Sequence, residues 1–447
     1  MTKHLASETA WYRLGPLLIA LTACLLGAVV ILGAKYLPLT LDSKLYGYPM
    51  PYWYADSQYY ISMSEGYVRY VQSPYCRRVL YPWIAGELST VSGLRFDLAF
   101  MACNYFSFIL AAYCLALTLR KLKINPWWVL AAFSTPVALE SLQRAYLPDL
   151  FHIALLSLFF LLLVYERAVA ALIVLMLAFL ARENTGLLCL VVAAVGYYSG
   201  RKVLLAGGLT VLLAGIACEA YFVHLGLPNR HHMPELIYTA LFVPCSFLGN
   251  VLGIIVWTNS SRPDGIPFWH MTLPYGLRLG SDHEIFVAYS WKRNLETLAA
   301  LLTLFGCGPM MLWFFRKRWV PVKEWAIALQ IAFFYGIICY FLGTSLGRTG
   351  TFRLIGYSWP LYWLALPWLL SGARLKIRVE EIVFLFASSI LLAYLPNLTG
   401  FMSPDRLVTF WLLSIPLLYV LMDFCLAAIR RRSDPAQEVE AIPHSTD

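Results

Sequence analysis

The sequence "DLFHIALLSLFFLLLVYERAVAALIVLMLAFLARENTGLLCLVVAAVGYYSGRK", residues 149–202, holds three apolar runs in close succession, at 149–165, 168–182 and 185–199. Each run approaches the roughly 20 apolar residues with which a helix crosses a bilayer. The joints between the runs are only a few residues long, so each helix must turn back beside the one before it. This stretch predicts tightly connected antiparallel helices in a membrane, with charged residues confined to the joints.

The composition of the whole chain agrees with this prediction. Of the 447 residues, 60% are hydrophobic and 13% are charged, whereas about 25% of the residues of an ordinary soluble domain are charged. The net charge of +9 arises from Lys and Arg in short loops, as is typical of cytoplasmic loops of membrane proteins. The basic balance therefore indicates membrane lipid as a partner and does not require nucleic acid.

We expect an all-α polytopic membrane protein with about 12 transmembrane helices, because an open strand exposed to lipid cannot satisfy its backbone. Residues 1–432 would form a single transmembrane domain, and the polar residues 433–447 a disordered cytoplasmic tail. The predicted spans lie at about 15–36, 96–119, 127–146, 149–165, 168–182, 185–199, 203–225, 295–315, 325–343, 354–371, 380–397 and 407–428.

Short basic loops predict the orientation of these spans. They are "RKLK" (120–123), "ER" (166–167), "GRK" (200–202), "RKRWVPVK" (316–323), "ARLKIR" (373–378) and "RRR" (430–432). With both termini in the cytoplasm, all of these loops are cytoplasmic, in keeping with the excess of Lys and Arg on that side of membrane proteins. The opposite ends of the helices then face the periplasm or the exterior.

Two long outer loops result from this topology, at about 37–95 and 226–294, and both are rich in Tyr, Trp and Pro. Such residues favour the membrane interface, so we expect interfacial helices in both loops. In the first loop, the plainer interpretation of Asp56 is the N-cap of such a helix over 57–70. In the second, the apolar run 237–257 is assigned to a re-entrant or interfacial helix, because a further span would reverse the sides of the later basic loops.

Charged residues gather at the predicted outer ends of the helices, where cations are scarce in membrane proteins. They come from four separate parts of the chain: Asp56, Glu65, Arg69, Arg77, Arg78, Glu140, Arg144, Asp149, Arg182, Glu183, Arg348 and Arg353. Arginine binds phosphate through a planar fork of donors, and a carboxylate can act as a general base. Together these residues suit a site for a phosphorylated substrate.

Each group also has a plainer interpretation. Arg182 and Glu183 could form only the turn of a tight hairpin. Asp149, after Pro148, could be a helix N-terminal acid stabilised by the macrodipole. Arg77 and Arg78 could attract anionic lipid without further specificity.

Cysteines and histidines give weaker signals. Of the ten cysteines, only Cys76 and Cys245 fall in or near predicted loops, where a disulfide between them is a conceivable pairing. The histidines of the second outer loop are His231, His232, His270 and His283. Their spacing matches no known metal motif, so a metal site and ordinary polar loop residues both remain open. His152, one helical turn after Asp149, is expected to be a hydrogen-bonded histidine inside the bundle.

The first outer loop contains "YADSQYYISMSEGYVRYVQSPYCRRVLYPWIAG", residues 54–86. This stretch resembles the GT-C superfamily of polytopic glycosyltransferases, in particular bacterial inner-membrane members. The resemblance rests on an Asp-x-x-x-Tyr stretch followed by Arg-x-Leu-x-Pro, here Asp56, Tyr60, Arg78, Leu80 and Pro82. It extends to the acid of "LPDLF", Asp149, and to the hairpin pair Arg182 and Glu183, and it covers the first half of the chain.

The resemblance implies a glycosyltransferase of the bacterial inner membrane that uses a polyprenyl-phosphate sugar and acts at the periplasmic or extracellular face. Its acceptor would be a glycan, a lipid or a protein. Asp56 would be the general base of an inverting transfer. The leaving phosphate would be bound by Arg77, Arg78, Arg182 and Arg353. Substrate-binding or supporting roles would fall to Tyr59, Tyr60, Glu65, Arg144, Asp149 and Glu183.

Two further questions stay open at this level. Some members of the superfamily hold a metal with a second acid two residues from the first, but here that position is Gln58, so a divalent metal, Mg²⁺ or Mn²⁺, is an open alternative. An O-antigen-type polymerase or ligase would share the topology, although it would carry its main arginine loop late in the chain. A secondary transporter would instead place charges and broken helices near the bilayer midplane.

Overall fold

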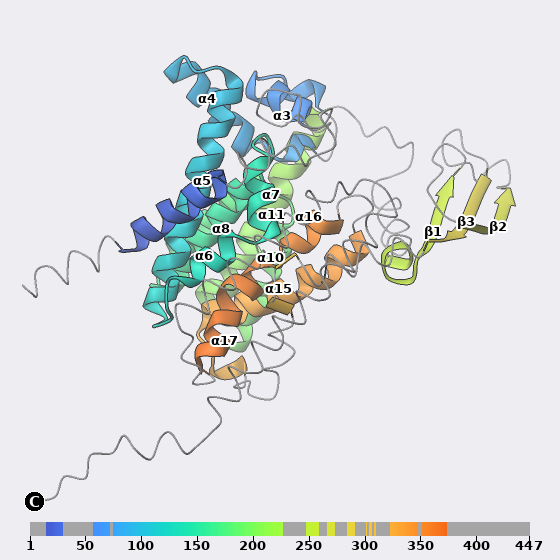
Figure 1. Ribbon diagram of the computed structural model, residues 1–447. Coiled ribbons are helices and arrows are strands. Elements are labelled where there is room, and N and C mark those ends of the chain that lie inside the picture. The colour runs from blue at the N-terminus through green and yellow to red at the C-terminus, as the bar shows by residue number, and fades with distance from the viewer. Residues whose placement is uncertain are drawn as a thin grey trace, which may run out of the picture.

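The structure is a computed structural model of the chain, and it is mostly helical (Figure 1). It describes residues 15–29, 57–71, 75–226, 247–258, 266–272, 284–290, 301, 304–305, 308–309, 322–346 and 351–372. The predicted spans 380–397 and 407–428, most of 295–315 and the tail 433–447 lie outside the described residues.

Helices cover most of the predicted spans within these ranges. A first helix occupies Gly15–Val29. The bundle that follows is built from α5 (Phe96–Lys121), α8 (Asp149–Val164), α9 (Ala168–Ala181), α10 (Thr185–Tyr198), α11 (Lys202–Leu225) and α15 (Ile327–Leu346). Two of them, α5 and α11, are long and apolar enough to cross a membrane, and the others are shorter apolar helices.

Two predicted spans are broken rather than continuous. The span 127–146 divides into α6 (Trp128–Phe133) and α7 (Pro136–Gln143), because Pro136 has no N–H to continue the helix and Thr135 before it is extended, with φ −68° and ψ 153°. The span 354–371 divides into α16 (Thr351–Gly356), the π-helical turn η6 (Leu361–Ala365) and α17 (Leu366–Gly372). The break falls at Tyr357 and Ser358, and Pro360 follows it at the start of the next helical segment.

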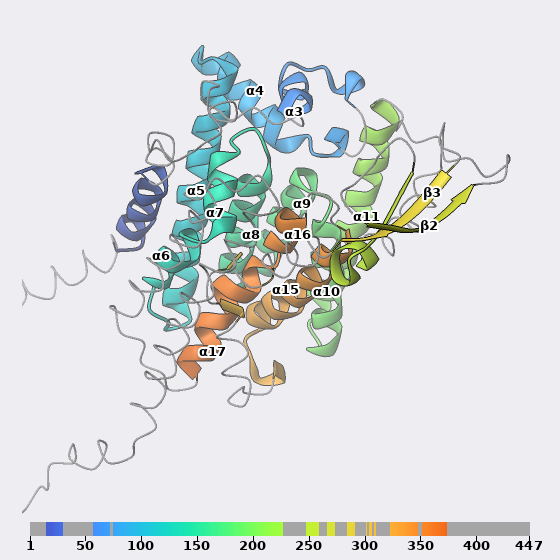
Figure 2. The same cartoon turned by 45° about the vertical axis from the view of Figure 1, so that its right-hand side comes forward.

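The expectation of an all-α chain is wrong for the predicted second outer loop. That loop contains a three-stranded antiparallel sheet in the order β1-β3-β2, which lies to one side of the helices in Figures 1 and 2. Its strands are β1 (Ile254–Thr258), β2 (Ile266–Thr272) and β3 (Glu284–Tyr289). Of the predicted helix over 237–257, residues 254–257 instead belong to β1, because the run Ile-Ile-Val-Trp-Thr has strong strand preference and pairs with β3.

The described part of the predicted first outer loop, 57–71 and 75–95, folds into short helices that pack over one end of the bundle. It contains α3 (Ser57–Ser64), the 3₁₀ turns η1 (Val68–Tyr70) and η2 (Tyr75–Arg77), and α4 (Leu80–Ser92). The predicted helix over 57–70 thus stops at Ser64, and Gly66 turns the chain with a φ of +87° that favours glycine. A small core of its own includes Tyr60, Tyr81 and Phe100.

Very short joints determine how the bundle runs. Because single left-handed residues such as Glu166 and Gly200 turn the chain, α8, α9, α10 and α11 alternate in direction. Gly196 lets α10 and α11 approach closely, since a Cβ there would lie 2.5 Å from the Leu205 nitrogen. The start of α8 and the α9–α10 joint therefore lie at one end of the bundle, and the α8–α9 and α10–α11 joints at the other. The 16 residues of α8 separate these ends by about 24 Å.

Candidate functional site

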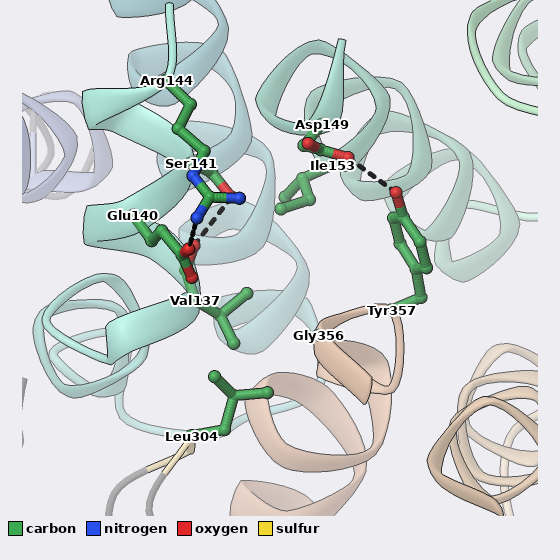
Figure 3. A pocket seen from close by; sticks show the side chains of 9 residues that line it. All are labelled: Val137, Glu140, Ser141, Arg144, Asp149, Ile153, Leu304, Gly356 and Tyr357. Atoms are coloured by element: carbon green, nitrogen blue, oxygen red, sulfur yellow. Dashed lines mark hydrogen bonds and ion pairs between the residues drawn. The ribbon is translucent and has the colours of Figure 1, made fainter. Parts of the chain in front are cut away.

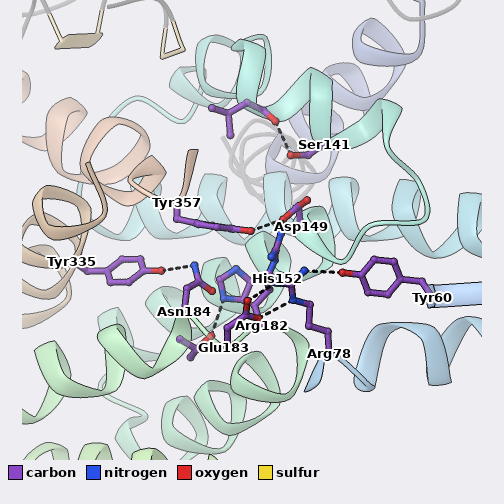
Figure 4. A network of polar contacts seen from close by, with 12 residues as sticks. Tyr60, Arg78, Ser141, Asp149, His152, Arg182, Glu183, Asn184, Tyr335 and Tyr357 are labelled. Carbon is purple, nitrogen blue, oxygen red and sulfur yellow. Dashed lines mark hydrogen bonds and ion pairs between the residues drawn. The ribbon is translucent and has the colours of Figure 1, made fainter. Parts of the chain in front are cut away.

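Arg78 lies between η2 and α4 and is buried, with 6% of its surface exposed. Its Nε donates to Glu183 Oε2 at 2.8 Å, its Nη2 donates to the other carboxylate oxygen of Glu183, and its Nη1 donates to the Tyr60 hydroxyl at 2.8 Å (Figure 4). Tyr60 comes from α3 and Glu183 from the α9–α10 joint, so one guanidinium connects the first outer loop to the bundle. This two-bond geometry is the strongest that Arg and a carboxylate form.

The pairing determines the charge of both groups. Burial alone would lower the pKa of the Arg78 guanidinium, but the Glu183 carboxylate outweighs burial and holds that pKa above its usual value. Burial alone would raise the pKa of Glu183, but Arg78, by its charge and its hydrogen bonds, and then Arg182 hold it below the usual range. Both side chains are therefore ionised at neutral pH.

Arg182 and Asp149 form a second buried pair beside the first. Arg182 Nη2 donates to Asp149 Oδ1, and only 3% of the Arg182 side chain and 7% of the Asp149 side chain are exposed. Tyr357 donates its hydroxyl to the same oxygen of Asp149 at 2.6 Å, and its ring centre lies 5.0 Å from the Arg182 guanidinium carbon. Asp149 also begins α8, where the helix dipole favours a negative charge. It therefore serves as both a helix N-terminal acid and an ion-pair partner.

We refer to Arg78, Glu183, Arg182 and Asp149, with Tyr60 and Tyr357, as the Arg–carboxylate cluster (Figure 4). Its members come from α3, the start of α4, the start of α8, the α9–α10 joint and the end of α16. Two guanidinium groups face two carboxylates, so the ionised cluster has no net charge. Arg78 uses three of its five N–H donors on Glu183 and Tyr60. Arg78 is thus held in place and keeps two N–H donors that bind neither Glu183 nor Tyr60.

Neutral polar groups surround the cluster. His152 Nε2 lies 2.9 Å from the Thr185 hydroxyl, which donates its own hydrogen to the Ala178 carbonyl at 3.0 Å. Thr185 must therefore accept a hydrogen bond from Nε2–H of His152, which leaves Nδ1 as an acceptor in the neutral ring. Within the described part of the chain, that Nδ1 is buried and has no hydrogen-bond partner. Asn184 donates to the Tyr335 hydroxyl at 3.3 Å.

A small pocket opens beside Asp149 (Figure 3). Its volume of about 20 Å³ accommodates one water molecule. Asp149 and Tyr357 form one wall, and the ion pair of Arg144 with Glu140 on α7 forms the opposite wall. The break between α6 and α7 thus places a third arginine–carboxylate pair, Arg144 with Glu140, across this pocket from the cluster.

The structure places other predicted residues differently. Arg77 is directed to Glu219 on α11, with 3.6 Å between Nη1 and Oε2, and its role in phosphate binding remains a prediction. Tyr59 stacks on Tyr75 with ring centres 4.5 Å apart, which makes it a support for the loop. Glu65 is exposed after α3, and no hydrogen bond or ion pair links its side chain to the cluster in the described residues.

The predicted base, Asp56, lies outside the described residues and directly precedes Ser57, the first residue of α3. Ser57 is fully buried and lies one helical turn before Tyr60, which contacts Arg78. Arg353 belongs to α16, four residues before Tyr357, and its side chain is likewise outside the described part. The roles of Asp56 and Arg353 remain predictions.

The metal question turns on the donor groups. Among the described residues, no group of three or more His, Cys, Asp or Glu side chains could hold a metal ion, and Asp149 and Glu183 are each held by a guanidinium. Asp56, the acid on which the metal alternative rests, lies outside the described residues, so metal dependence remains a prediction and we derive no step through a metal. In the second outer loop, His270 Nε2 lies 3.4 Å from Glu284 Oε1. The other predicted residues outside the described part of the chain are His231, His232, His283, Arg348 and Cys245.

Sequence reasoning missed Tyr357, which joins Asp149 to the far end of the chain. A signal was present in "GYSWP", residues 356–360, because a tyrosine between Gly and Ser before Pro marks a break in an otherwise apolar span. It also missed Glu219 as the partner of Arg77, although an acid inside an apolar run calls for a cation nearby.

No protein-family model matches this chain, and no curated protein matches it.

Proposed function

We propose that this chain is a polytopic membrane glycosyltransferase that moves a sugar from a polyprenyl-phosphate donor to a glycan, lipid or protein acceptor at the outer face of a bacterial inner membrane. Twelve spans, cytoplasmic termini and a GT-C-like plan belong to this proposal. The Arg–carboxylate cluster carries it. Two buried arginines from distant segments, Arg78 and Arg182, converge at the end of the bundle opposite the basic joints, where lipid electrostatics alone does not call for them.

The proposed reaction is a single inverting displacement. The acceptor hydroxyl gives its proton to Asp56 and its oxygen forms a bond to the anomeric carbon, while the bond from that carbon to the phosphate oxygen breaks and its electron pair leaves with the phosphate. Asp56 suits this role because it directly precedes α3, whose Tyr60 contacts Arg78.

The remaining N–H groups of Arg78 and Arg182 would donate to the leaving phosphate. Since the paired carboxylates hold both guanidinium groups in place, these donors need not reorganise as negative charge develops. Glu183 and Asp149 are positioning residues in this scheme. A lost donor of this kind lowers kcat by about 100- to 1,000-fold in known oxyanion sites.

The test is sugar transfer in membranes that contain the chain, with polyprenyl-phosphate mannose, arabinose and aminoarabinose as donors. We expect transfer from one donor, loss of at least 100-fold in Asp56→Asn, by analogy with loss of a general base, and loss in Arg78→Lys. The matched control is Asp97→Asn, which removes an acid of the same outer region whose ion-pair partner Arg95 is 81% exposed. Full transfer by Asp56→Asn would refute its role as base. Cysteine labelling that placed residues 57–71 in the cytoplasm would refute the outer site.

A secondary transporter is the second candidate, because one observation favours it. Broken helices mark many transporter sites, and both broken spans here contribute to the pocket beside Asp149, through Glu140 and Arg144 from α7 and Tyr357 from the break after α16. Uptake of a polar solute into proteoliposomes that lack any polyprenyl-phosphate sugar, abolished by Asp149→Asn, would favour transport over transfer.

A further inference from the structure

A second pocket lies at the end of the bundle away from the Arg–carboxylate cluster. It has a volume of about 680 Å³, within the usual size of small-molecule sites. The end of α5, the α8–α9 joint, the α10–α11 joint and the start of α15 line it. Residues from the three basic loops predicted at 120–123, 166–167 and 200–202 are therefore brought together around one hollow.

The rim of this pocket is cationic. Lys121, Arg201 and Lys202 line it, and Glu166 is the carboxylate among its lining residues, which gives the lining a net charge of +2. All four side chains are exposed. Lys121 is oriented by the Tyr165 ring, whose centre lies 5.2 Å from its Nζ. The charges of the rim thus remain accessible to a ligand.

The backbone adds to this positive field. Three helices begin at the pocket, α9 at Ala168, α11 at Lys202 and α15 at Ile327. None of them has an acidic residue in its first turn, and the N-cap residues of α9 and α11 make no side-chain capping hydrogen bond. Their first N–H groups and the positive ends of their dipoles are available to an anion.

The interior of the pocket is apolar, with Leu163, Val164, Trp325 and Ile327 among the lining residues. A free inorganic anion would leave this apolar surface uncovered, whereas an amphiphile would contact both the cationic rim and the apolar interior. We propose that this pocket binds the phosphate group of an anionic phospholipid of the cytoplasmic leaflet, with the first carbons of its chains against the apolar wall. The site goes beyond the proposed sugar transfer and does not depend on it, but it rests on the orientation given under the proposed function, with this end of the bundle in the cytoplasm.

The experiment is titration of the delipidated full-length chain, in neutral detergent, with phosphatidylglycerol, with phosphatidylcholine and with inorganic phosphate, read by native mass spectrometry and by the melting temperature. We expect retention of phosphatidylglycerol over phosphatidylcholine. Arg201→Gln/Lys202→Gln should weaken binding about 25-fold, from about a fivefold loss per cation. Glu166→Gln should tighten binding about fivefold, because it removes the opposing charge.

The matched control is Lys123→Gln/Arg167→Gln, which removes two exposed cations from the same loops outside the pocket lining. It should change the affinity by less than about threefold, as expected for exposed charges that touch no ligand. Equal loss in both double variants would overturn the proposal in favour of diffuse attraction to a basic surface. If inorganic phosphate bound as tightly as phosphatidylglycerol, the bound phosphate group would not need to come from a lipid, and the proposal would be overturned. Melting without lipid shows that each variant is folded.

Discussion

Asp149→Asn tests the buried pair at the centre of the site. The substitution preserves shape and removes charge, so Arg182, whose side chain is only 3% exposed, is left without its countercharge. Tyr357 loses a charged acceptor for its hydroxyl. Breaking a buried ion pair from one side costs about 3–5 kcal/mol. We expect the free energy of unfolding to fall by about that amount, which is a change of at least 100-fold in the folding equilibrium.

The assay is reversible unfolding of the purified chain in detergent micelles, followed by circular dichroism. Asp97→Asn is the matched control, and it should lower the free energy of unfolding by no more than about 1 kcal/mol, because its partner Arg95 is exposed. The double variant Asp149→Asn/Arg182→Gln should recover part of the loss, since it leaves no unpaired buried charge.

The reasoning would be refuted if Asp149→Asn cost no more than Asp97→Asn. It would also be refuted if the double variant lost the sum of its two single losses, because additivity would mean that Asp149 and Arg182 do not interact.

Other predictions concern the neighbouring groups. Tyr60→Phe should lower the free energy of unfolding by about 1.5–3 kcal/mol, the usual contribution of a hydrogen bond to a charged group, measured by the same unfolding assay with exposed Tyr67→Phe as the control. Because the pKa of Glu183 is depressed in the folded chain, its infrared carboxylate band should persist at pH 4, and its protonated band should appear only at lower pH. The stability from this pair should be full above its ordinary pKa of 4.5 and be lost as the pH falls toward the folded pKa, whereas Glu183→Gln should lack this dependence. Gly196→Leu should separate α10 from α11 and lower the melting temperature, whereas Gly15→Leu, with open space around it, should not; equal melting of the two variants would contradict the close packing.

The helices and their order could be predicted from the sequence, because apolar runs and short basic joints are patterns within contiguous residues. Six apolar runs became helices close to their predicted bounds, and the joints at 120–123, 166–167 and 200–202 came together at one end as their charge pattern predicted. The errors also have local causes. Pro136 begins a new helix after the extended Thr135, α16 ends at Gly356 although the hydropathy continues, and β-branched residues after Gly253 pair as a strand inside an apolar run.

The candidate site, too, could be predicted only in part from the sequence. Arg78, Asp149, Arg182 and Glu183 stood out in the sequence because charged residues at helix ends in an apolar chain require partners. Which cation faces which acid was decided only by the tertiary structure, since Arg78 and Glu183 are 105 residues apart and Tyr357 reaches Asp149 across 208 residues. Hydropathy records how deeply a residue lies in the membrane, whereas ion pairing depends on how the helices are rotated and packed, and that is determined by the whole bundle.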